Sequence, residues 1–230
     1  MRIVLDRCCL DREHWSLAAN GIIAEGIHLV SGDVGSGKTT LALMLAGLLE
    51  PSSGTVLREG ISSLMVSFQY PEYHVTGAAV RDECRSWGVE PSALIPAANL
   101  NGKEELSPLR LSRGELKRLH LACVMAGTYD LLILDEPFSS LDCREKERVC
   151  NELSRRTKGI TLIFTHEQSL FPRVDFIWEI ADGRLRSRGR LPGALQHWEH
   201  APALVKKLIS LGKMPDNISP PDLREAACRT

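Results

Sequence analysis

Hydrophobic positions fall into short runs and longer segments that alternate along the chain. The short apolar runs predict strands, some of them buried on both faces of a sheet. They cover Ile3 to Leu5, Gly26 to Val30, Leu64 to Phe68, Leu131 to Leu134, Thr161 to Thr165 and Phe176 to Ile180, with a turn at Asp182 and Gly183. The longer segments predict helices at Thr39 to Leu49, Val80 to Trp87, Arg113 to Ala126, Cys143 to Arg156 and Ala203 to Leu211. Strands that alternate with helices predict an α/β fold whose sheet is mostly parallel and covered by helices on both sides.

Two segments depart from this alternation. Residues 80–109 are polar and rich in proline and alanine, which predicts a small inserted helical region. The tail from Pro192 to Thr230 carries one predicted helix, and the prolines after it predict a loop.

Length, composition and charge narrow the class of protein. The 230 residues are 43% hydrophobic and 25% charged, as expected for one globular domain or one domain that carries a subdomain. The formal net charge of -1 disfavours a protein whose main task is to neutralise nucleic-acid phosphates. No nucleic acid is therefore expected as a partner.

The cysteines and the amino terminus predict a reduced, cytoplasmic location. Seven cysteines, an odd number, occur without a C-x-x-C pair, which predicts neither a disulfide framework nor a zinc site. Asp6 and Asp11 interrupt the stretch in which a secretory signal needs apolar residues. The longest apolar run, Leu41 to Leu49, is shorter than the roughly 20 residues that span a bilayer. Any attachment to a membrane is expected through a partner.

The octapeptide GDVGSGKT carries the most specific chemistry in the sequence. It matches the G-x-x-x-x-G-K-S/T pattern of a phosphate-binding loop and lies between a predicted strand and a predicted helix, as this motif requires. Glycines let backbone N–H groups surround a polyphosphate, and the following helix presents its positive end to the same anion. We expect Lys38 to reach the β- and γ-phosphates of ATP and Thr39 to bind Mg²⁺. The residues expected to contact the nucleotide are Gly32, Asp33, Val34, Gly35, Ser36, Gly37, Lys38, Thr39 and Thr40.

A second signal is LLILDEP, an apolar strand that ends in two adjacent carboxylates. Taken alone, this pattern is common and favours a surface turn. After a phosphate-binding loop in an alternating α/β chain, it favours a catalytic site. We then expect Asp135 to belong to the Mg²⁺ shell and Glu136 to act as a base toward the attacking water.

A third signal is LSRGE, in which Ser112 and Gly114 precede a predicted helix. Such a helix start can bind an anion. By itself the pattern is only an amino-terminal cap, and its place just before the Asp-Glu strand is what favours a nucleotide contact.

Six motifs, the three above and three more, resemble those of the ATP-binding cassette (ABC) ATPases in type and in their order along the chain. LSRGE is similar to the LSGGQ signature of that family, Gln69 to its Q-loop glutamine, SSLD at 139–142 to its D-loop and His166 to its switch histidine. The resemblance covers residues 32–166. It implies a P-loop NTPase core with a small antiparallel β region in an ATPase domain at 1–200. It also implies a helical subdomain at about 78–126 and a carboxyl-terminal helix-and-loop extension at 201–230.

The resemblance also implies a mechanism that the residues alone do not give. ATP and Mg²⁺ are the expected cofactors, and two ATPase chains pair head to tail. Ser112 and Gly114 of one chain would contact the γ-phosphate bound on Lys38 of the other. Gln69 would contribute to the Mg²⁺ and water shell, and His166 would hold the γ-phosphate and orient the catalytic glutamate.

The sequence departs from the family pattern at the signature and at the adenine site. Arg113 stands where the signature has its first glycine, and Glu115 replaces its glutamine. The aromatic residue that stacks on adenine in most relatives is missing from its usual place. Arg12 aligns there and Trp15 lies nearby, and both remain open as the stacking residue.

Two further segments resemble the ATPases of energy-coupling-factor and cobalt-type importers. They are FQYPEYHVTGAAVRDEC at 68–84 and APALVKKLISLGKMP at 201–215. This resemblance implies uptake of a vitamin or a transition-metal ion by a homodimer, or a heterodimer with a sister ATPase. The dimer would work with an integral membrane coupling subunit and a substrate-binding membrane subunit, on the inner face of the cell membrane. The alternatives are the ATPase of another ABC importer or of an exporter, and a soluble ABC ATPase without a transport role.

Overall fold

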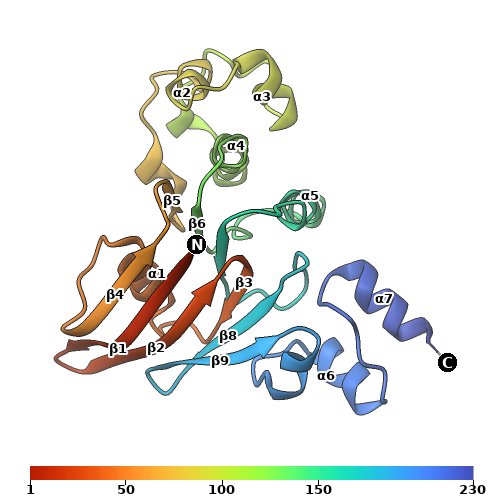
Figure 1. Ribbon diagram of the computed structural model, residues 1–230. Coiled ribbons are helices and arrows are strands. Elements are labelled where there is room, and N and C mark those ends of the chain that lie inside the picture. Colours follow the sequence, from red (N-terminus) through yellow and green to blue (C-terminus); the bar gives the residue numbers. More distant parts are fainter. Residues whose placement is uncertain (230) are drawn as a thin grey trace.

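A single nine-stranded sheet forms the centre of the computed structural model, which describes residues 1–229 (Figure 1). The strands follow the order β4-β1-β2-β9-β8-β3-β7-β6-β5. Their bounds are β1 Arg2–Arg12, β2 Trp15–Ala24, β3 Gly26–Ser31, β4 Ser53–Glu59, β5 Leu64–Ser67, β6 Leu131–Asp135, β7 Ile160–Phe164, β8 Phe176–Ala181 and β9 Arg184–Arg190. Strands β8, β3, β7, β6 and β5 pair in parallel, whereas β4-β1-β2 and β8-β9 pair antiparallel. The predicted fold class is confirmed.

Seven α-helices and three short 3-10 turns complete the described part of the chain. The α-helices are α1 Lys38–Ala46, α2 Val80–Ser86, α3 Pro91–Ala97, α4 Arg113–Ala126, α5 Cys143–Ser154, α6 Ala203–Ser210 and α7 Pro220–Cys228, and the 3-10 turns are η1 Pro71–His74, η2 Pro108–Arg110 and η3 Gly193–His197. Helices α2, α3 and α4 gather beyond the β5 edge of the sheet, at the top of Figure 1. Within residues 1–229, no helix combines the length and the apolar character that crossing a membrane requires.

Successive side chains of the central strands point to opposite faces of the sheet, so the core has two layers. On β6, Leu131 and Ile133 pack with α1 on one face, whereas Leu132 and Leu134 pack with α5 and α6 on the other. This is the period-2 geometry of a strand buried on both sides. A third apolar cluster joins α2, α3 and α4. Val205 of α6 belongs to one of the two sheet-face clusters, so the carboxyl-terminal segment packs on the main core. The subdomain bounds stay predictions.

The prediction missed the strands β2, β4 and β9 and gave β1 only its first half. β1 contains a β-bulge, where the register with β2 shifts between Leu5 and Cys8 and Arg7 adopts a φ of 46°. A bulge reverses the alternation of inward and outward side chains, so the apolar pattern on its two sides does not read as one strand.

The prediction differs from the structure at the end of the first helix and in the tail of the chain. The first helix was expected to run to Leu49, but it ends at Ala46 because Gly47 adopts a left-handed φ of 76° and its N–H bonds back to the last turn. The segment after Leu211 was expected to be a loop, and this expectation is wrong. Helix α7 begins at Pro220, since proline is well suited to the first helical position. Thr230, the end of the predicted loop, lies outside the described residues.

Candidate nucleotide-binding site

The phosphate-binding loop connects β3 to α1, as its sequence context requires. Strand β3 ends at Ser31, and α1 begins at Lys38 with Gly37 as its cap at a φ of 100°. The Nζ of Lys38 donates to the carbonyl oxygens of Gly32 and Asp33 at 2.7 and 2.9 Å. Burial lowers the pKa of Lys38, although the carboxylates of Glu136 and Asp135 oppose this effect. The loop thus holds a buried ammonium group at the positive end of a helix.

Neighbouring backbone leaves no room for a side chain at Gly32, so we expect a substitution there to destabilise the fold. A Cβ built at Gly32 lies 2.8 Å from the carbonyl oxygen of Ile180, whereas one built at Gly35 meets no described heavy atom within 4 Å. Both glycines have positive φ. We expect Gly32→Ala to lower the free energy of unfolding by about 1–3 kcal/mol more than Gly35→Ala, since a neighbouring strand cannot move aside. Urea denaturation of the two variants without nucleotide measures this difference, and equal losses would contradict it.

Thr39 and Asp135 form the part of the site that fits Mg²⁺. The Thr39 hydroxyl donates to Oδ2 of Asp135 at 2.6 Å. The other carboxylate oxygen, Oδ1, is buried and has no hydrogen-bond partner among the described residues. Burial raises the pKa of Asp135, in part offset by the Thr39 hydroxyl. A hydroxyl and a carboxylate oxygen are the hard donors that Mg²⁺ prefers beside a phosphate, so the residues present fit this ion. Among residues 1–229, no group of three or more His, Cys, Asp or Glu could hold a metal by itself.

Glu136 is held on three sides at the end of β6. Its Oε2 accepts from the Thr165 hydroxyl at 3.0 Å, and its Oε1 accepts from the backbone N–H of His166 at 3.1 Å and lies 2.7 Å from Nδ1 of the same histidine. Glu136 has a φ of 48°, a strained conformation for a residue other than glycine. Its side chain is 9% exposed, whereas that of His166 is 55% exposed. The residues that follow β7 therefore orient the Glu136 carboxylate, and the exposed imidazole of His166 lies beside it.

One pocket of about 350 Å³ collects most of the predicted site residues. The lining residues are Trp15, Val34, Gly35, Gly37, Lys38, Thr39, Thr40, Gln69, Asp135, Glu136 and His166. Gln69 joins the pocket from the end of β5, where its carbonyl accepts from the Lys117 ammonium at 3.2 Å. The structure thus places the loop, the two carboxylates, Gln69 and His166 around one cavity.

The remaining predicted residues do not line this pocket. Gly32, Asp33 and Ser36 shape the loop behind it, and the Ser36 hydroxyl is buried without a partner among the described residues. Ser112 caps α4 in a capping box with Glu115, whose pKa is lowered to about 2 by Lys103 and by the Ser112 backbone.

Gly114, the second residue of α4, also lies outside the pocket. A Cβ built there would lie 2.9 Å from the carbonyl oxygen of Ser140, so α4 approaches the 139–142 segment closely. Within one chain, Ser112 and Gly114 contribute nothing to the pocket that contains Lys38.

Trp15 is a pocket residue that the sequence left undecided. It begins β2 and lines the cavity, whereas Arg12 does not. A Cβ added to Gly37 would lie 2.3 Å from Cζ2 of Trp15, so the indole ring lies directly against the phosphate-binding loop. The short turn between β1 and β2 produces this arrangement, and the motif spacing alone did not reveal it.

Comparison with known proteins agrees with this geometry. The ABC transporter family model matches residues 21–139, just over half of the chain. The energy-coupling factor transporter ATP-binding protein EcfA1 of Thermotoga maritima is 34% identical over 183 residues, which cover 69% of each chain. EcfA2 of the same organism is 28% identical over 231 residues, or 88% of this chain and 86% of the relative.

A solved structure shares the fold over nearly its whole length. It is the ATP-binding cassette MJ0796, described as a dimer in a post-hydrolysis state bound to ADP and Pi. The TM-score is 0.64, and the match covers 83% of this chain and 99% of the other. At 18% identity, this likeness shows the fold alone. Together with the family match, it agrees with a nucleotide-binding fold built around the loop at 32–39. The chain therefore belongs to the ABC transporter family, as one of its ATP-binding cassette ATPases.

Proposed function

We propose that this chain binds and hydrolyses ATP to energise a membrane importer of the energy-coupling-factor type. One observation carries the hydrolytic part of the proposal. Glu136 is held by Thr165 and His166 in the same pocket as Lys38 and the Thr39–Asp135 pair. A phosphate-binding lysine, hard oxygen donors and an oriented carboxylate are the parts that phosphoryl transfer to water needs.

The residues divide the chemistry among themselves. Lys38 and the loop N–H groups bind the β- and γ-phosphates. Mg²⁺, held by Thr39 and Asp135, would neutralise the charge that develops on the phosphate oxygens. Glu136 accepts a proton from a water molecule whose oxygen bonds to the γ-phosphorus, while the bridging oxygen leaves with ADP. Gln69 orients the water and the ion shell, and His166 contacts the γ-phosphate. Trp15 stacks on the adenine base from the loop side.

A second ATPase chain completes the site in this proposal. Ser112 and Gly114 lie outside the pocket of their own chain, and Ser112 and Arg113 are exposed at the start of α4. An exposed helix start of this kind can meet an anion bound to another chain. The partner is a second copy of this chain or a sister ATPase, paired head to tail. Arg113 then enters the shared interface as a positive charge beside the phosphates.

The likeness to the energy-coupling factor ATP-binding proteins supports the importer role. A membrane coupling subunit docks beside Gln69, where Tyr70 and Tyr73 are exposed aromatic side chains. Exposed aromatic residues beside a nucleotide site suit a protein partner. The dimer thereby lies on the inner face of the membrane through its partners, together with a substrate-binding membrane subunit.

Affinity purification from the native host in mild detergent tests this role. We expect a multispanning membrane protein to copurify with the tagged chain. Tyr73→Lys is expected to remove that protein, because it places a charge in the docking surface. Leu211→Lys, at another exposed apolar residue just after α6, serves as the control. Purification without any integral membrane partner would contradict the importer role, and equal recovery with both variants would contradict docking at Tyr73.

A further inference from the structure

A buried carboxylate beside the phosphate-binding loop has no part in the site described above. Glu179 lies on β8 and is 0% exposed. Its neighbours along the strand, Trp178 and Ile180, pack in the hydrophobic core. Burying a charged carboxylate is unfavourable unless hydrogen bonds and opposite charges compensate for the lost water. The partners of Glu179 therefore indicate what the charge is for.

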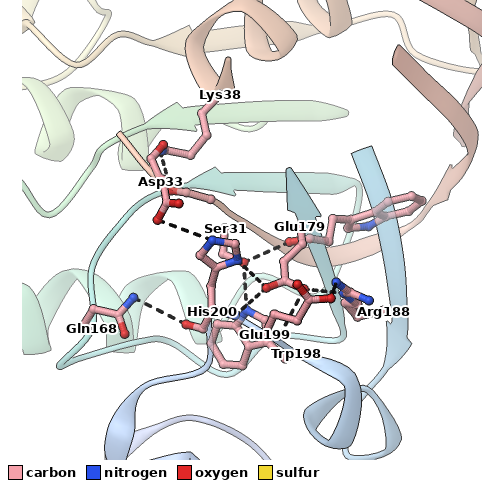
Figure 2. A network of polar contacts seen from close by, with 11 residues as sticks. Ser31, Asp33, Lys38, Gln168, Glu179, Arg188, Trp198, Glu199 and His200 are labelled. Carbon is pink, nitrogen blue, oxygen red and sulfur yellow. Dashed lines mark hydrogen bonds and ion pairs between the residues drawn. The ribbon is translucent and has the colours of Figure 1, made fainter. Parts of the chain in front are cut away.

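Four donors surround this carboxylate, and three of them come from one short segment (Figure 2). Arg188 of β9 forms an ion pair with Oε2. The backbone N–H of Glu199 donates to Oε2 at 3.2 Å, and that of His200 donates to Oε1 at 2.5 Å. Nδ1 of the His200 ring lies 2.6 Å from Oε1. Burial opposes ionisation, but these hydrogen bonds outweigh it and hold the pKa of Glu179 below its ordinary value. Glu179 is thus a charged anchor for the segment 198–200.

The anchored segment contacts the end of β3 and the phosphate-binding loop that follows it. The indole Nε1 of Trp198 donates to the Ser31 hydroxyl, at the end of β3, at 2.8 Å. Two residues later, Nε2 of His200 lies 3.5 Å from Oδ1 of Asp33, inside the loop (Figure 2). The carbonyl oxygen of Asp33 in turn accepts from Lys38. A contact that orients Asp33 therefore acts on the part of the loop that holds the lysine.

The same segment also reaches the switch region. The side-chain amide of Gln168, two residues after His166, donates to the carbonyl oxygen of His200 at 3.5 Å. His200 is thus the residue that meets both the loop and the segment that carries the switch histidine.

Glu179 fixes the Nδ1 side of the His200 ring, and the Nε2 side faces the phosphate-binding loop. Its Nδ1 lies 2.6 Å from Oε1 of Glu179 and its Nε2 lies 3.5 Å from Oδ1 of Asp33, so one ring bridges two carboxylates. The Asp33 side chain is 87% exposed, whereas that of His200 is 21% exposed. The ring, held by Glu179, is the rigid partner, and the loop carboxylate is the one whose freedom it restricts.

We propose that His200 is a positioning residue for the phosphate-binding loop, held by the buried Glu179 and holding Asp33. It preorganises the loop for nucleotide and links the segment that leads into the carboxyl-terminal helices to ATP affinity. This inference rests on the proposed nucleotide site at Lys38. It goes beyond that site because His200 touches neither the pocket nor the reacting atoms.

His200→Asn is the sharpest test, because the shorter amide can still donate to Glu179 but cannot reach Asp33. An exposed polar contact of this kind contributes about 0.2–1 kcal/mol, so we expect the variant to bind ATP about 1.4- to fivefold more weakly. Equilibrium titration with a fluorescent ATP analogue measures this loss. Steady-state kinetics should show a matching rise in KM with kcat unchanged. His197→Asn, an exposed histidine of η3, is the matched control and should bind as the wild type does.

A double-mutant cycle separates positioning from a merely structural role. In the Asp33→Asn background, His200→Asn should weaken binding no further, because the contact is already lost. An unchanged ATP affinity with a lower melting temperature would overturn the inference, as would a fall in kcat alone or full additivity with Asp33→Asn. If the wild-type chain bound no ATP analogue, the nucleotide site itself would be wrong, and the inference with it.

Discussion

Glu136→Gln is expected to lower steady-state ATP hydrolysis by about 10²–10⁴-fold, the usual contribution of a positioned general base. The amide keeps the size of the carboxylate but cannot accept a proton from water. Its environment should change little, because Thr165 and His166 contact the same two side-chain positions. Phosphate release by the purified assembly measures the loss, and ATP should remain bound to the variant.

Glu147→Gln provides the control for this substitution. Glu147 is an exposed glutamate of α5, outside the pocket, and its replacement should leave turnover unchanged. Near-normal hydrolysis by Glu136→Gln would show that another group acts as the base.

Lys38→Ala is expected to weaken ATP binding by about 100-fold or more. The ammonium group is buried and bonded to the carbonyls of Gly32 and Asp33, so it is already desolvated before any phosphate arrives. Removing one partner of a buried, hydrogen-bonded charge pair costs about 2–5 kcal/mol, and about 2.7 kcal/mol corresponds to a 100-fold change. Equilibrium titration with a fluorescent ATP analogue gives the affinity.

Lys206→Ala, at an exposed position of α6, is the control and should bind ATP as the wild type does. Circular dichroism of Lys38→Ala should show the native secondary structure, since Lys38 is the first residue of α1 and alanine is a good helix former. An affinity within threefold of the wild type would remove Lys38 from the phosphate site.

The central parallel strands and the pocket could be predicted because each rests on a local sequence pattern. β6 and β7 are uninterrupted apolar runs, and parallel strands of an α/β fold end at the edge where ligands bind. The residues that follow such strands, among them Glu136 and His166, therefore meet around the loop. Spacing in the sequence was sufficient for this part of the site.

The residues that the sequence missed or left open depend on contacts between distant segments. Trp15 enters the pocket because a β-bulge and a tight turn set the course of β1 and β2. Glu179 and His200 are 21 residues apart, and the sequence gives no motif that pairs them. A glutamate inside the otherwise apolar strand FIWEIA was the one available signal, because a buried charge needs a partner.

In the proposed dimer, ATP lies between Lys38 of one chain and the start of α4, with Ser112 and Gly114, of another. The most direct test of this arrangement is a cryo-electron microscopy structure of the Glu136→Gln assembly, purified from the native host with Mg²⁺ and ATP. We predict that the phosphates contact Lys38 and Thr39, with Ser112 and Gly114, or their equivalents in a sister ATPase, facing the γ-phosphate from the second chain. Nucleotide bound elsewhere, or a γ-phosphate with no second ATPase chain beside it, would contradict the account.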